Sequence, residues 1–99
     1  MNISKNQNGS NLEISLEGRL DTITAPVLEE ELKGSLDDVN ELVLDFEKLE
    51  YISSSGLRSL LKVQKQMSST GSMKVLHVGE LVREVLELTG FDNILTIED

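Results

Sequence analysis

The sequence predicts an α/β fold, and two observations carry this prediction. Period-2 segments typical of strands alternate along most of the chain with amphipathic segments of helical period. The chain has 99 residues, which suits one compact domain and is too short for two. Because such alternation is typical of parallel strands joined by right-handed crossovers, we expect a single small domain with a mostly parallel sheet.

The N-terminal segment predicts a hairpin. Residues 2–5 form a short first strand with Ile3 facing inward, and Asn8-Gly9 is a typical hairpin turn. A second strand covers residues 11–20, where apolar side chains occupy alternating positions, namely Leu12, Ile14, Leu16 and Leu20. We expect these two strands to pair antiparallel, which makes the sheet mixed.

After Asp21 the apolar period becomes helical, at Ala25, Leu28, Leu32 and Leu36. Thr24 is a candidate N-cap for this helix, Pro26 is tolerated in its first turn, and Gly34 permits a left-handed exit. Residues 42–46 are then almost continuously apolar. This run predicts a central strand that is covered on both faces.

The C-terminal half continues the alternation. A second helix begins in the serines at 53–55 and ends near Gly71, with one side formed by Leu57, Leu60, Leu61, Gln64 and Met67. A strand at 73–78 and a helix at about 80–88 follow, with Gly90 past the helix end. A possible edge strand closes the chain, at Ile94, Leu95 and Ile97.

The functional surface of such a sheet usually lies beyond the carboxyl ends of its strands. Three segments converge there in the predicted topology, at residues 20–25, 50–57 and 79–80. Any functional site is therefore expected among these segments.

Composition and net charge exclude several classes of binding partner. Nine Lys and Arg against 18 Asp and Glu give a net charge of −9, which disfavours direct binding to nucleic acid or to an anionic membrane surface. The chain has no cysteine, no apolar run long enough to span a membrane and no signal-like start. We expect a cytoplasmic monomer whose partners are proteins.

Catalytic apparatus is not evident in the sequence. His77, the one histidine, falls in an alternating segment without metal-ligand spacing, so a structural role is preferred and no metal or cofactor is expected. Residues 52–56 lack the first glycine of a serine hydrolase elbow, and the phosphate-loop motif is missing. We therefore expect a protein that is not an enzyme, and a hydrolase using Ser54 is the weakest alternative.

The segment Ser53-Ser54-Ser55-Gly56-Leu57 lies between a predicted strand and a predicted helix. One serine suffices to cap the helix, so the redundancy invites a second explanation. A helix N-terminus has free amides and a positive dipole end, so the fold would tolerate a phosphate on a serine there. The segment thus has the profile of a phosphorylation switch, with helix capping as the structural alternative.

These residues carry a family resemblance. LVLDFEKLEYISSSGLRSLL, the turn from Gly18 to Ala25 and the closing LTGFDNIL resemble the bacterial anti-sigma factor antagonists of the STAS domain family. The resemblance spans nearly the whole chain, so residues 1–99 are expected to be one STAS domain. It implies a four- or five-stranded sheet flanked by helices. It also implies partner switching, in which the unphosphorylated antagonist binds an anti-sigma factor that is a serine kinase and so releases the sigma factor.

The resemblance also implies roles for single residues. The family's Asp-Ser-[Ser/Thr]-Gly-Leu motif aligns with residues 53–57, which makes Ser54 the phosphoacceptor, and a serine phosphatase would reset it. Ser53 departs from the motif, because many members carry aspartate there. Asp21 matches the family's turn aspartate, and Arg58 is predicted near the same site because it follows Leu57. The predicted partner-binding residues are Asp21, Thr24, Ser53, Ser55, Gly56, Leu57 and Arg58.

Purely structural roles stay open for two of these residues. The Asp21 carboxylate fits a cap for the following helix as well as a partner contact, and Arg58 fits a solvated helix position. At the level of the whole domain, the alternative function is a ligand- or nucleotide-sensing module in a signalling complex, since related domains occur in sensor assemblies and on anion transporters.

Overall fold

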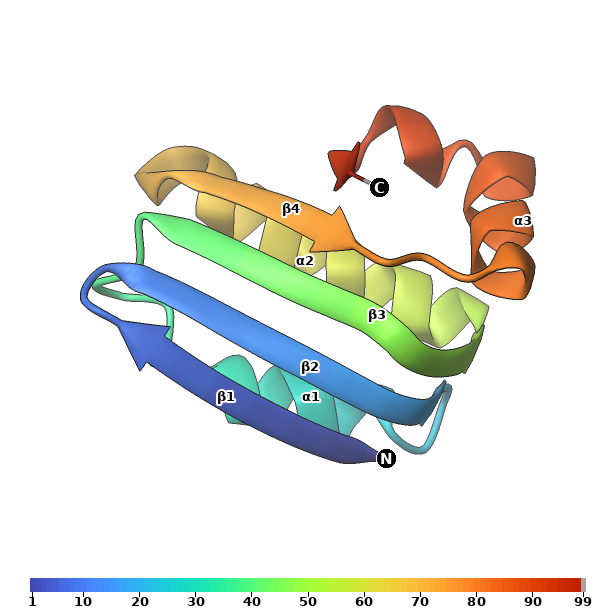
Figure 1. Ribbon diagram of the computed structural model, residues 1–99, viewed down its shortest axis with the longest axis horizontal. Coiled ribbons are helices and arrows are strands. Elements are labelled where there is room, and N and C mark those ends of the chain that lie inside the picture. The colour runs from blue at the N-terminus through green and yellow to red at the C-terminus, as the bar shows by residue number, and fades with distance from the viewer. Residues whose placement is uncertain (99) are drawn as a thin grey trace.

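A computed structural model describes residues 1–98, which form one five-stranded sheet with helices (Figure 1). The strands lie side by side in chain order, as β1 (Asn2–Asn8), β2 (Asn11–Leu20), β3 (Glu41–Ile52), β4 (Ser72–Leu76) and β5 (Ile97–Glu98). β1 is antiparallel to β2, and every later pair is parallel. The predicted α/β class, the mixed sheet and the N-terminal hairpin are therefore confirmed.

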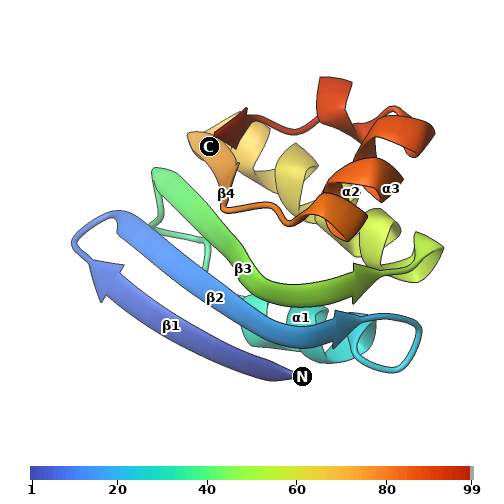
Figure 2. The ribbon, with the colours of Figure 1, turned by 45° about the vertical axis from the view of Figure 1, so that its right-hand side comes forward.

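The helices are α1 (Ala25–Leu32), α2 (Ser54–Thr70) and α3 (Glu80–Thr89), and a short 3-10 turn (Phe91–Asn93) follows α3. α1 and α2 lie on the same side of the sheet in both ribbon views, and α3 lies past the carboxyl end of β4 (Figures 1 and 2). Within residues 1–98, no helix has the length and apolar character needed to cross a membrane.

The core fills the space between one face of the sheet and the helices. Register aligns buried side chains across three strands, as in Ile14, Leu44 and Val75. The next residues along these strands, Ser15, Asp45 and Leu76, point to the opposite face and are only half-buried. The expectation that the central strand is covered on both faces is therefore wrong, because α1 and α2 cover the same face.

Several element boundaries differ from the sequence prediction. β1 and β3 are longer than predicted, and the polar pair Glu47-Lys48 conceals the continuation of β3 to its buried end at Ile52. α1 ends at Leu32, so Leu36 is buried outside the helix. β4 ends at Leu76, two residues earlier than predicted, and the closing edge strand is only two residues long.

His77 is the clearest correction. It lies just past β4 instead of inside an alternating strand, its backbone has φ 57°, and its side chain is exposed. Nδ1 of His77 stands 3.0 Å from Oδ1 of Asp45 on β3. The imidazole is therefore a surface group paired with a carboxylate and does not belong to the core.

Candidate functional site

The segments that follow β2 and β3 meet at the carboxyl edge of the sheet, as predicted (Figure 1). Leu20 and Ile52 are register partners at the ends of these strands, and the Ser53 N–H donates to the Leu20 carbonyl at 2.9 Å. We call the surface formed by Asp21, Thr22, Thr24, Ser53, Ser54, Ser55 and Arg58 the carboxyl-edge surface.

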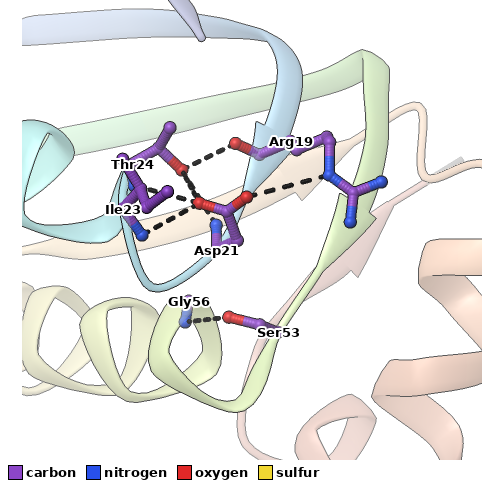
Figure 3. Close-up of polar contacts among 6 residues, drawn as sticks. All are labelled: Arg19, Asp21, Ile23, Thr24, Ser53 and Gly56. Atoms are coloured by element: carbon purple, nitrogen blue, oxygen red, sulfur yellow. Dashed lines mark hydrogen bonds and ion pairs between the residues drawn. The ribbon is translucent and has the colours of Figure 1, made fainter.

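Asp21 organises the turn between β2 and α1 (Figure 3). Its Oδ1 accepts from the N–H of Ile23 at 3.0 Å and from the N–H and hydroxyl of Thr24, both at 3.1 Å. The Thr24 N–H is the strongest of the influences that hold the pKa of Asp21 below its ordinary value, and the Arg19 guanidinium, with Nε 3.7 Å from Oδ2, adds to them. Asp21 is therefore a carboxylate fixed by the backbone of its own turn.

Thr24 occupies the N-cap position of α1, but its side chain makes no cap bond to the helix. Its hydroxyl shares one proton between the carbonyl of Arg19, at 2.7 Å, and Oδ1 of Asp21, at 3.1 Å, and its oxygen accepts from the N–H of Asp21 at 2.8 Å. The predicted capping role of Thr24 is therefore wrong. The reason is that the hydroxyl bridges the two sides of the turn and is no longer available to the helix amides.

The three serines at the start of α2 have three different environments. Ser53 is the N-cap of α2, and its Oγ accepts from the N–H of Gly56 at 3.3 Å (Figure 3). Ser55 is half-buried, and its hydroxyl shares a hydrogen bond of 3.2 Å with that of Thr22. Ser54 is exposed at the first position of α2, with no side-chain hydrogen bond to any described residue. The fold thus uses Ser53 and Ser55 and leaves Ser54 accessible.

Gly56 and Leu57 are buried, and they shape the loop from beneath. A Cβ on Gly56 would stand 2.8 Å from both Cγ and the carbonyl oxygen of Leu20 and 2.9 Å from Cγ1 of Ile52. Only glycine therefore allows the start of α2 to lie this close to the ends of β2 and β3. The partner-binding role predicted for these two residues stays a prediction, and neither has a side chain at the surface.

Arg58 is exposed one turn into α2. It borders a shallow depression between the starts of α1 and α2 that is also lined by Thr22, Ala25, Pro26, Glu29, Ser55 and Lys62. Its guanidinium therefore belongs to the same surface as the Ser55 hydroxyl. The partner-binding roles of Asp21, Thr24, Ser53, Ser55 and Arg58 likewise stay predictions.

A partly buried contact that the sequence did not reveal joins the two helices next to this surface. Oε2 of Glu29 on α1 accepts from the hydroxyl of Ser59 on α2 at 2.6 Å, and Oε1 lies 3.0 Å from Nζ of Lys62. The hydrogen bond from Ser59 and then the one from Lys62 lower the pKa of Glu29. Because 30 residues separate Glu29 from Ser59, no local pattern signals this contact.

Two exposed features of the turn were also missed. Ile23, next to Asp21, is 81% exposed. The sequence signal for this exposure was an apolar residue that lies in a polar turn and outside the apolar positions of the following helix. The guanidinium of Arg19 stacks over the ring of its strand neighbour Tyr51, 4.3 Å from the centroid. Ile23 therefore adds an exposed apolar side chain to the carboxyl-edge surface, and Arg19 adds a cation that is stacked on Tyr51.

Comparisons with known proteins agree with this architecture. The model of the STAS domain family matches residues 2–99. A putative anti-sigma factor antagonist, BtrV of Bordetella bronchiseptica, is 38% identical over 84 residues, which cover 83% of this chain and 72% of that protein. The anti-sigma-B factor antagonist of Bacillus subtilis is 26% identical over 98% of this chain and 90% of its own. The crystal structure of an anti-sigma factor antagonist from Mycobacterium paratuberculosis superposes with a TM-score of 0.87 at 25% identity, covering 97% of this chain and 83% of that one.

Proposed function

This chain belongs to the STAS domain family, and we propose that it is an anti-sigma factor antagonist whose binding to its partner is abolished by phosphorylation of Ser54. The unphosphorylated protein binds an anti-sigma factor that is also a serine kinase, and this binding releases the sigma factor. A serine phosphatase restores the binding form. The names of the curated relatives support the antagonist function, and the rest is argued from the carboxyl-edge surface.

The observation that carries the proposal is the exposure of Ser54 between two engaged serines. A kinase must bring the acceptor hydroxyl into its own active site, which requires a side chain that the fold does not hold. Ser53 accepts from Gly56 and Ser55 bonds to Thr22, so both hydroxyls are engaged in local contacts. Ser54 meets the requirement without loss of a contact within residues 1–98.

The position of Ser54 also suits a phosphate. It begins a helix of 17 residues that has no acidic residue in its first turn, so the unpaired amides and positive dipole end are available to an anion. Phosphorylation adds about −1.5 to −2 charges at pH 7. We expect the modified protein to stay folded and to differ from the unmodified one mainly in its surface charge.

The departure at Ser53 fits the same scheme. Serine and aspartate are comparably good N-caps, because either side-chain oxygen accepts from an amide in the first turn. Ser53 therefore keeps the capping function that an aspartate would have there. What changes is one negative charge next to the acceptor, which bears on the choice of kinase and not on the presentation of Ser54.

The energy needed for a switch is modest. A dianion in an interface fitted to a neutral hydroxyl adds bulk and an unpaired charge, and such a charge costs several kcal/mol when it is buried. Because about 1.4 kcal/mol corresponds to tenfold in affinity, a penalty of about 3 kcal/mol weakens binding by more than 100-fold.

The test is phosphorylation in vitro by the cognate anti-sigma factor with ATP, followed by mapping of the phosphosite by mass spectrometry. We expect a single label on Ser54, which is lost in Ser54→Ala and kept in Ser55→Ala. Capture from native extract, with wild-type protein, Ser54→Ala and Ser54→Asp as baits, should recover the anti-sigma factor with the first two only. A label on Ser55, or equal capture by all three baits, contradicts the proposal.

A further inference from the structure

The open face of the sheet carries a group of metal-ligating side chains away from the carboxyl-edge surface. Asp45, Glu47 and His77 each offer one ligand atom, and these atoms all lie within 4.8 Å of one another. Asp45 and Glu47 are two residues apart on β3, so their side chains share a face, and His77 reaches them from the end of the neighbouring strand. The group thus joins segments about 30 residues apart in sequence.

The backbone at His77 brings the imidazole to this face. Val75 on β4 is buried against the helices, and continued alternation would point His77 the same way. Instead its φ of 57° turns the chain into the left-handed region, which non-glycine residues seldom adopt. The Nδ1 atom thereby comes to 3.0 Å from Oδ1 of Asp45.

We propose that Asp45, Glu47 and His77 form a binding site for a divalent transition metal ion, of the class of Zn²⁺ or Co²⁺. An imidazole nitrogen with two carboxylate oxygens suits these ions, whereas Mg²⁺ and Ca²⁺ prefer ligands that are all oxygen. Zinc ligands lie about 2.0–2.2 Å from the ion, so Nδ1 of His77 and Oδ1 of Asp45, now 3.0 Å apart, must separate slightly to admit it, while the Glu47 carboxylate must move inward. The Glu47 side chain is exposed and able to close that distance.

The surroundings favour a cation. The N–H of Glu47 donates to Oδ1 of Asp45 at 3.0 Å, which orients that carboxylate as an outer-shell hydrogen bond does at metal sites. Glu13 lies diagonally across from Asp45 on the same face and adds negative charge. Two lysines lie near the group: Lys74 is paired with Glu41 at 3.2 Å and with Glu98 at 3.7 Å, and the exposed Lys48 borders the same hollow as Asp45 and Glu47. Three protein ligands would leave positions on the ion for water or an external ligand.

The test uses untagged protein at about pH 8, above the ordinary imidazole pKa of about 6.5. Calorimetric titration with ZnCl₂ should give one saturable site. The dissociation constant for Zn²⁺ should rise at least ~10-fold in His77→Asn and in Glu47→Gln. Asparagine tolerates the left-handed conformation, so His77→Asn keeps the backbone and removes only the imidazole. Glu84 is an exposed residue of α3, away from the proposed site. Glu84→Gln removes the same charge as Glu47→Gln and should leave zinc affinity unchanged.

A second measurement locates the ion independently. Amide NMR signals near Asp45, Glu47 and His77 should shift or broaden on addition of Co²⁺, while MgCl₂ should leave them in place. The proposal is overturned by Zn²⁺ affinity that is unaffected by His77→Asn, by changes spread over the acidic surface, or by the absence of saturable binding. Thermal unfolding of each variant without metal shows whether it is folded.

Discussion

The hydroxyls of Thr22 and Ser55 lie 3.2 Å apart and join the loop after β2 to the first turn of α2. Beside them, the Ser53 N–H bonds to the Leu20 carbonyl at 2.9 Å. The two segments are therefore hydrogen-bonded to each other at the edge of the sheet, and Ser54 lies between the residues that make these contacts.

Gly56→Ala should destabilise the fold. Its new Cβ would meet the Leu20 backbone and two side chains at under 3 Å, and such overpacking costs about 1–3 kcal/mol. Urea unfolding measures the change. Gly79→Ala is the matched control, because a Cβ there has nothing within 4 Å and the backbone φ is −74°. Equal stability of the two variants would contradict the close approach of α2 to β2.

Ser53→Ala should lower the free energy of unfolding by about 1 kcal/mol, because it removes the cap that accepts from Gly56. Ser53→Asp should restore most of that loss. Ser54→Ala should change stability by less than about 0.5 kcal/mol, since the side chain is exposed. Chemical denaturation of the three variants under identical conditions measures these free energies of unfolding. A larger loss in Ser54→Ala than in Ser53→Ala would contradict the assignment of Ser53 as the cap.

Ser54→Asp should stabilise the isolated protein slightly, by about 0.3–1 kcal/mol at low salt, because it places a negative charge at the N-terminus of α2. The same substitution should weaken binding to the anti-sigma factor. Thr70→Asp puts the charge at the other end of the helix and should be destabilising. Thermal melts at low and high ionic strength measure both effects, which salt should diminish.

Asp21 should make stability depend on acid pH. Its folded-state pKa is lowered below 3.8, so its contribution is present above that pH and is lost as pH falls through the lowered folded value. The stability difference between wild type and Asp21→Asn should therefore shrink between about pH 5 and about pH 2. NMR titration of the Asp21 carboxyl checks the direction, and a pKa at or above the ordinary value would contradict the turn geometry.

Glu29→Ala should cost about 1–3 kcal/mol, because it leaves the buried Ser59 hydroxyl without its acceptor. Lys62→Ala removes only the exposed partner of the same carboxylate and should cost at most about 1 kcal/mol. The double variant Glu29→Ala with Ser59→Ala should recover part of the loss. Urea unfolding of wild type, Glu29→Ala, Ser59→Ala and the double variant completes a double-mutant cycle.

The sequence predicted the element order well where one face of an element is buried. β2 was predicted with its observed bounds, because buried apolar residues occupy every second position along it except at Gly18. β3 was predicted too short, because Glu47 and Lys48 lie at an irregular stretch where the register with β2 shifts. Such a register shift depends on the neighbouring strand and leaves no local periodic signal.

The site was predicted in outline and missed in detail for the same reason. Connectivity of parallel strands was enough to bring residues 20–25 and 50–57 to one edge. Which serine caps, which one bonds to Thr22 and which one is exposed depends on side-chain directions at the start of α2. The prediction of Thr24 as a cap failed because its hydroxyl found nearer partners in the turn.

By itself, the sequence determined the α/β class, the hairpin and the helices, because burial of an amphipathic pattern is encoded in local spacing. Only the tertiary structure decided that Ser54 is the exposed serine, that Glu29 holds Ser59, and that His77 stands beside Asp45. These relationships join residues from different elements. Their geometry follows from how the strands register and how the helices pack, which no single stretch of sequence specifies.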